Sequence, residues 1–94
     1  MGISFLKRLR DPIARGEITC TIRIWQRPQV KIGGRYVMEH GFVRVTRMRQ
    51  ITLHDITPEL ARTSGFAGVV DLLKTAKHGP GEKVYLIDLV YEDA

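Results

Sequence analysis

Strict alternation of apolar and polar residues over 16–25 is the feature that most constrains the fold. A period of two is typical of a β-strand with one buried face. The apolar positions, which we expect to face a core, are Ile18, Cys20, Ile22 and Ile24. The intervening positions, which combine an acid, two hydroxyls, a guanidinium and an indole, are Glu17, Thr19, Thr21, Arg23 and Trp25. We expect this second row to face a cleft.

The remaining patterns predict a small α+β domain in which helices cover the open ends of a curled sheet. With 94 residues, we expect one domain over 1–94. Helical spacing of apolar residues indicates a short helix near 5–13, and a second helix over 67–77 follows a short helical turn capped by Thr57. Two strands joined at His40-Gly41, the second of them long, and a last strand over 83–93 complete the pattern. A long strand in so small a domain usually bends around a barrel.

The distribution of charge points to an anionic partner. The chain has a net charge of +5, but residues 1–50 hold eleven basic and three acidic side chains, a balance of +8. Residues 51–94 hold four basic and seven acidic side chains. Nine of the eleven basic residues in the first half are arginines, whose planar fork suits phosphates and base edges. A nucleic acid or nucleotide is the partner that this asymmetry indicates, and a merely soluble basic face is the alternative.

Hydropathy and the remaining composition narrow the class of protein further. No apolar run approaches the roughly 18 residues of a membrane span, and the first residues do not follow the pattern of a signal peptide. We therefore expect a cytoplasmic protein with no membrane partner. Cys20 is the single cysteine and falls on the apolar side of its strand, where a core role fits better than nucleophilic chemistry. The histidines lie apart at positions 40, 54 and 78, so we expect no metal site and no cofactor.

Three stretches in order along the chain resemble the ASCH domain family of PUA-like proteins. They are "IARGEITCTIR", "VKIGGRYVM", and "VTRMRQITLHDITPELARTSGFAGVVDLLKT" with "KVYLIDLVYE". The resemblance runs nearly end to end. It implies a single ASCH domain with an α+β fold, a small PUA-like mixed β-barrel with covering helices.

The resemblance also implies two kinds of function. Most such domains are regarded as RNA-associated modules with a cleft between barrel and helices. Some compact bacterial members are amidohydrolases that remove acyl groups from N4-acylated cytidine, using a Lys and a Thr on the first strand and a Glu after the Ile-Thr turn. Thr21 matches the catalytic threonine, but Ile18 stands at the lysine position, and the segment expected to carry the glutamate offers Ser64 and no carboxylate. A threonine hydroxyl needs a nearby base to become a nucleophile. The substitutes that we consider are Glu17, Lys31 and Glu59.

The sequence therefore predicts a cleft for RNA, or for a nucleoside or nucleotide, beside the first strand, with amidohydrolase activity as the alternative. Hydroxyls and a guanidinium would bind the ligand, Trp25 would stack on a base, and the glycine loop over 31–36 would approach a phosphate. The predicted ligand-binding residues are Thr19, Thr21, Arg23, Trp25, Lys31, Gly33, Arg35 and Ser64. Plainer interpretations remain open: a solvent-facing strand for the threonines, a barrel plug for Trp25 and a simple turn at Gly33-Gly34.

Overall fold

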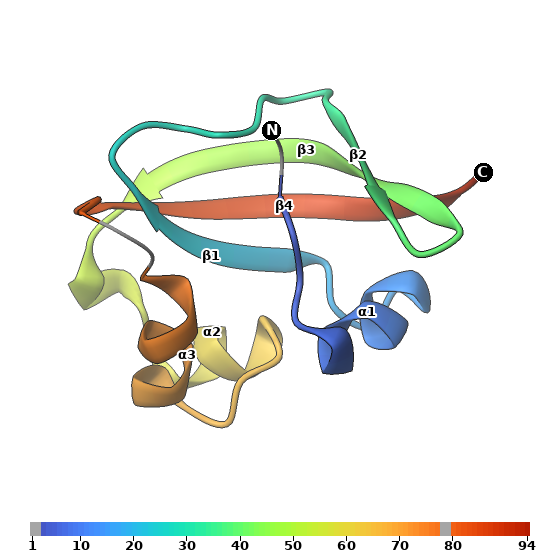
Figure 1. Cartoon of the computed structure of the whole chain (residues 1–94). Coiled ribbons are helices and arrows are strands. Elements are labelled where there is room, and N and C mark those ends of the chain that lie inside the picture. Colours follow the sequence, from blue (N-terminus) through green and yellow to red (C-terminus); the bar gives the residue numbers. More distant parts are fainter. Residues whose placement is uncertain (1–2, 78–79) are drawn as a thin grey trace.

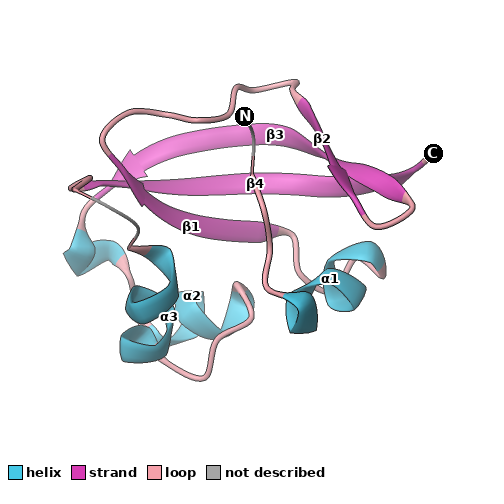
Figure 2. Cartoon of the chain, in the orientation of Figure 1, coloured by secondary structure: helices cyan, strands magenta, loops and turns pink. Residues whose placement is uncertain are grey.

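A four-stranded antiparallel sheet, curled into a half-barrel, forms the centre of the domain, and short helices gather on one side of it (Figures 1 and 2). The computed structural model describes residues 3–77 and 80–94. The elements follow one another as α1 (Lys7–Ala14), β1 (Cys20–Trp25), β2 (Arg35–Met38), β3 (Gly41–Ile51), a 3₁₀ turn η1 (Leu53–Asp55), α2 (Pro58–Thr63), α3 (Val69–Ala76) and β4 (Lys83–Asp93). This architecture confirms the expectation of a small α+β domain.

The sheet differs from the expected mixed barrel in its pairing and in its closure. Its strand order is β1-β4-β3-β2, and every pair of neighbouring strands in the described chain is antiparallel. The one parallel contact there is an isolated bridge between Ile24 and Lys77. β1 and β2 stay at opposite edges, since four strands are too few to close a barrel of the usual size. The open side is crossed instead by the N-terminal segment, which runs over the sheet to α1 (Figure 1).

Local signals set the ends of several elements. The Thr57 hydroxyl accepts a hydrogen bond of 3.1 Å from the Leu60 N–H, which caps α2, and Pro58 occupies its first turn. Gly65 follows with a φ of 99°, a left-handed conformation that glycine adopts readily and that ends the helix. In β3, a register shift between Val45 and Arg47 bends the long strand, as its length predicted.

Both faces of the sheet are covered, which the alternating pattern did not predict. The larger core packs α1, α2 and α3 against side chains such as Ile22 and Leu86. A second cluster on the other side joins Trp25, Val30, Val45, Tyr85 and Ile87. Val30 comes from the connection between β1 and β2, which arches over the sheet on the side away from α2 and α3 (Figure 2). The row that was expected to face a cleft is therefore partly a core row.

Replacing Leu72 in α3 by alanine is expected to lower the free energy of unfolding by about 2–5 kcal/mol, because the substitution leaves a cavity in the core. Leu72 is fully buried, whereas Val70 on the same helix is 68% exposed. The matched variant Val70→Ala should change stability by less than about 0.5 kcal/mol. Urea unfolding measures both, and equal midpoints for the two variants would show that α3 packs through a different face.

Candidate functional site

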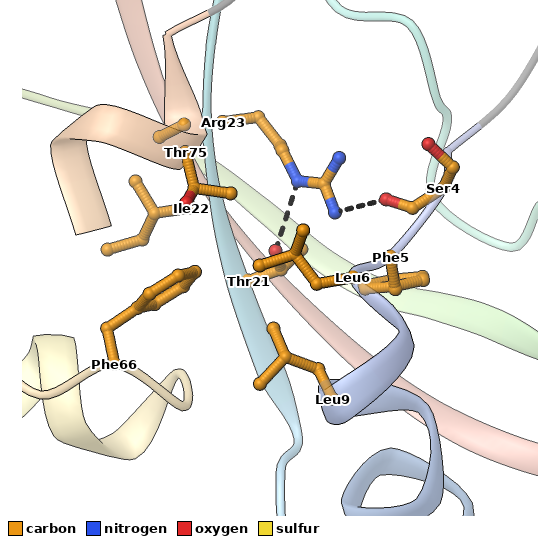
Figure 3. A pocket seen from close by; sticks show the side chains of 10 residues that line it. Ser4, Phe5, Leu6, Leu9, Thr21, Ile22, Arg23, Phe66 and Thr75 are labelled. Atoms are coloured by element: carbon orange, nitrogen blue, oxygen red, sulfur yellow. Dashed lines mark hydrogen bonds between the residues drawn. The ribbon is translucent and has the colours of Figure 1, made fainter. Parts of the chain in front are cut away.

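A pocket of about 170 Å³ lies along β1, between the N-terminal segment with the start of α1 on one side and the end of α3 on the other (Figure 3). We call it the Arg23 pocket. It is lined by Ser4, Phe5, Leu6, Leu9, Thr21, Ile22, Arg23, Phe66, Thr75 and Ala76. Its walls are mainly apolar, with one guanidinium and three hydroxyl side chains among them. Such a combination, apolar walls with few polar groups, is typical of ligand sites.

Arg23 is held by neutral partners only. Its Nη2 donates to the Ser4 carbonyl at 2.7 Å, and its Nε donates to the Thr21 hydroxyl at 3.1 Å (Figure 3). The guanidinium also lies over the Phe5 ring, 5.0 Å from its centroid. No carboxylate is among the described residues that line the pocket, and Arg23 forms no ion pair with any described acid. A unit positive charge is therefore left uncompensated at the pocket wall.

The position of this charge carries an electrostatic cost. Burial lowers the pKa of Arg23 from its usual 12.5 to about 10, because desolvation disfavours the charged form. The side chain is still charged at neutral pH. A half-buried charge without a counter-ion is unfavourable, and an anion that enters the pocket would reduce this cost.

A second arginine lies against the other aromatic ring that lines the pocket. The Arg8 guanidinium is 5.2 Å from the centroid of Phe66, and its Nη1 donates to the Gly65 carbonyl at 2.9 Å. Each phenylalanine of the pocket therefore has a cation over one face, an arrangement that favours positive charge at that ring. Because Phe5 and Phe66 are almost fully buried, they serve as apolar walls.

The backbone of β1 adds main-chain polar groups at the same place. β1 is an edge strand whose one neighbour is β4, and the Leu89 N–H donates to the Thr19 carbonyl at 2.9 Å. In an antiparallel pair the residues alternate between those that bond to the neighbour and those that point away. From the register, Thr21 and Arg23 bond to β4, so the N–H and C=O of Ile22 point to the open edge, where Ile22 lines the pocket.

The structure brings together only part of the predicted ligand-binding row. Thr21 and Arg23 meet in the pocket. Thr19 is exposed in a separate depression beside Tyr91, while Trp25 is 5% exposed and packs 5.9 Å from Tyr85, centroid to centroid. The Ser64 hydroxyl is buried and donates to backbone carbonyls of its own helix. The faces of the indole are thus covered by protein, as in the plainer interpretation of a plug.

The glycine loop lies away from this pocket, and three of its backbone donors are already used. The Lys31 N–H donates to the Tyr36 hydroxyl, the Gly33 N–H to the Val45 carbonyl and the Gly34 N–H to the Lys31 carbonyl. Gly33 has a φ of 84°, which explains the glycine by the turn itself. Arg35 lies on β2, where it contacts the Glu92 carboxylate at 3.5 Å. None of these residues lines the Arg23 pocket.

The groups considered for catalysis are not assembled around Thr21. Glu17 is exposed and paired with Arg15 at 2.7 Å, Glu59 is exposed in the first turn of α2, and Lys31 is in the loop described above. No lysine or carboxylate is found among the described residues that line the pocket. Cys20 is buried, and burial raises the pKa of its thiol, which disfavours the reactive thiolate.

Sequence reasoning missed Ser4, Phe66 and Thr75 as pocket residues. Ser4 acts through its backbone carbonyl, for which no sequence pattern exists. Phe66 follows the glycine that ends α2, and an aromatic residue at such a place usually indicates core packing. The one signal in the sequence that pointed to this region was the number of arginines in α1, among them Arg8.

In comparisons with known proteins, no protein-family model, curated protein or solved structure matches the chain. Within 3–77 and 80–94, no group of three or more His, Cys, Asp or Glu side chains is arranged to hold a metal ion, and His78 lies outside these ranges. No helix in the same ranges is long and apolar enough to cross a membrane.

A Thr21→Val variant should lose about 1 kcal/mol of stability, because the Nε–H of Arg23 loses its buried acceptor while the branched shape of the side chain is kept. Thr19→Val is the matched control, since Thr19 is exposed and its hydroxyl has no hydrogen bond to another described residue. Thermal or urea unfolding of the two variants gives the comparison. Equal loss in both would mean that the Thr21 hydroxyl does not hold Arg23.

Proposed function

We propose that the protein binds single-stranded RNA or a nucleotide through the Arg23 pocket. The observation that carries the proposal is the Arg23 guanidinium, which is half-buried at the pocket wall, is held by neutral partners and has no acidic partner among the described residues. A phosphate oxygen accepts charge-assisted hydrogen bonds from arginine, and such bonds are stronger where water is excluded. The net charge of +5 would favour the approach of a polyanion to the protein as a whole.

The size of the pocket limits what enters it. A volume of about 170 Å³ is below the range of about 300–1,000 Å³ that holds a whole drug-sized ligand. One phosphate or one base would occupy it, and the neighbouring units of the ligand would lie over its rim. Bases of single-stranded nucleic acids are free to reach such a site, because they are not paired in a helix. The Ile22 backbone edge would offer one donor and one acceptor to the polar edge of a base.

We include in this proposal the assignment of the domain to the ASCH, PUA-like type. The half-barrel, the covering helices and the position of the pocket between sheet and helices support it at the level of architecture. The amidohydrolase alternative is not proposed. A hydrolase that attacks through Thr21 would need a base within hydrogen-bond reach of the hydroxyl, and the neighbour there is the Arg23 Nε, which is a donor.

Replacing Arg23 by glutamine should weaken the binding of labelled single-stranded RNA by about ten- to a hundred-fold, which corresponds to the loss of a charge-assisted contact of about 1.5–3 kcal/mol. Affinity should also fall steeply with salt, as expected when phosphates are neutralised. Titrations at low and moderate salt measure both effects.

Arg15→Gln is the matched control for net charge. Arg15 is exposed and paired with Glu17, and it does not line the Arg23 pocket. This variant should bind within about twofold of the parent protein, since surface ion pairs contribute little. Equal loss in the two variants would indicate diffuse attraction by the whole surface, and the absence of any binding at low salt would refute the proposal.

A further inference from the structure

The number of charges and donors in the Arg23 pocket restricts the kind of phosphate that it can hold. Arg23 is the one charged side chain among the described residues that line it. Nε and Nη2 already donate to Thr21 and Ser4, and Nη1 has no hydrogen-bond partner among the described residues. The other side-chain donors at the wall are the hydroxyls of Ser4, Thr21 and Thr75.

We propose that the anionic group accepted by this pocket is a singly charged phosphodiester, as found inside a nucleotide chain, and that a doubly charged terminal phosphate is rejected. This inference rests on the proposed function of the pocket. It adds the class of phosphate, and therefore the part of a nucleic acid that occupies the site.

Charge balance in the pocket favours a phosphodiester. A phosphodiester carries one negative charge and forms a neutral pair with Arg23. A terminal phosphate carries about −1.5 to −2 charges at neutral pH, so it would leave excess negative charge against the apolar side chains Phe5, Leu6 and Leu9. An uncompensated charge beside apolar walls is strongly unfavourable.

The supply of hydrogen-bond donors also favours a phosphodiester. A phosphodiester has two non-bridging oxygens, which Nη1 and one of the hydroxyls can serve. A terminal phosphate presents three strong acceptor oxygens, each with more than one lone pair. The partners of Nε and Nη2 are parts of the fold, so these donors become available only if Arg23 releases Ser4 or Thr21.

The pH dependence of binding distinguishes the two kinds of phosphate. A doubly charged terminal phosphate takes up one proton with a pKa of about 6 and then carries one charge, like a phosphodiester. Histidine, the side chain that normally titrates in this range, is not among the described residues that line the pocket. The charged residues on the flanking α1 are Lys7, Arg8, Arg10 and Asp11. Those on α3 are Asp71 and Lys74, and Lys77 follows directly after this helix. The residue paired with Arg23 on β4 is Tyr85. Any effect of their titration is shared by both ligands.

The experiment compares uridylyl-uridine, which contains only a phosphodiester, with uridine 5′-monophosphate and with uridine, by calorimetric or NMR titration at constant ionic strength. The affinity of uridylyl-uridine should be flat with pH. The affinity of uridine monophosphate should be lower at neutral pH and should rise by up to about 25-fold between about pH 7.5 and about pH 5.5, following its singly charged fraction. Arg23→Gln should weaken the binding of both phosphates, and Arg15→Gln should weaken the binding of neither.

A short oligouridylate with and without a 5′-phosphate provides a second pair of ligands. The added phosphate should give no gain in affinity that depends on Arg23.

Monophosphate binding at about pH 7.5 that equals or exceeds that of the phosphodiester would overturn the inference. A 5′-phosphate that tightens oligouridylate binding through Arg23 would do the same. In both cases the proposed function would stand, because RNA still binds through Arg23. Failure of every probe and of RNA at low salt would instead refute the proposed function, and the inference with it. Uridine binding as tightly as uridylyl-uridine would show that the pocket recognises the base alone.

Discussion

The hydrogen bond from Arg23 to the Ser4 carbonyl is the contact on which the arrangement of the site depends. It joins an edge strand of the half-barrel to the N-terminal segment that crosses its open side (Figure 1). Phe5 is carried by the same segment into the core, beneath the guanidinium. The N-terminal segment also lines a second depression, together with Val37 and Met38 of β2, the strand at the opposite edge of the sheet. One side chain of β1 thereby positions a wall for a sheet that four strands leave open.

The charges of the two halves of the chain interleave in the sheet, so the basic first half is less exposed as a positive surface than its composition suggests. Glu92 of β4 contacts Arg44 at 3.2 Å and Arg35 at 3.5 Å, which joins three strands near the far edge. Arg47 is opposite Asp88 in the register of β3 and β4. Arg23 differs from these arginines because its partners are a carbonyl and a hydroxyl. A charge held by neutral dipoles is kept in place without being cancelled.

The edge of β1 shows how the fold protects a strand that could otherwise pair with another chain. An exposed edge is a template for unwanted pairing. Here the Ile24 end is bridged to Lys77, and the middle of the strand lies in a narrow pocket between α1 and α3. The N–H and C=O of Ile22 thus point to this edge without a strand partner, while the flanking helices obstruct pairing with a long extended chain. The walls of the pocket therefore also protect the edge.

The sequence alone determined the elements whose signals are local. The alternation over 16–25 predicted β1, although the strand begins only at Cys20. Thr57 and Gly65 predicted the ends of α2, and apolar spacing predicted the α3 face that contains Leu72, because each depends on neighbours within a few residues. Only the tertiary structure decided that the sheet stays open, that Trp25 is buried and that Ser4 and Thr75 meet Arg23. The physical reason is that these outcomes depend on contacts between distant segments. When a loop covers the second face of the sheet, the alternation along a strand still predicts to which face a side chain points. It no longer predicts whether that side chain meets core, pocket or solvent.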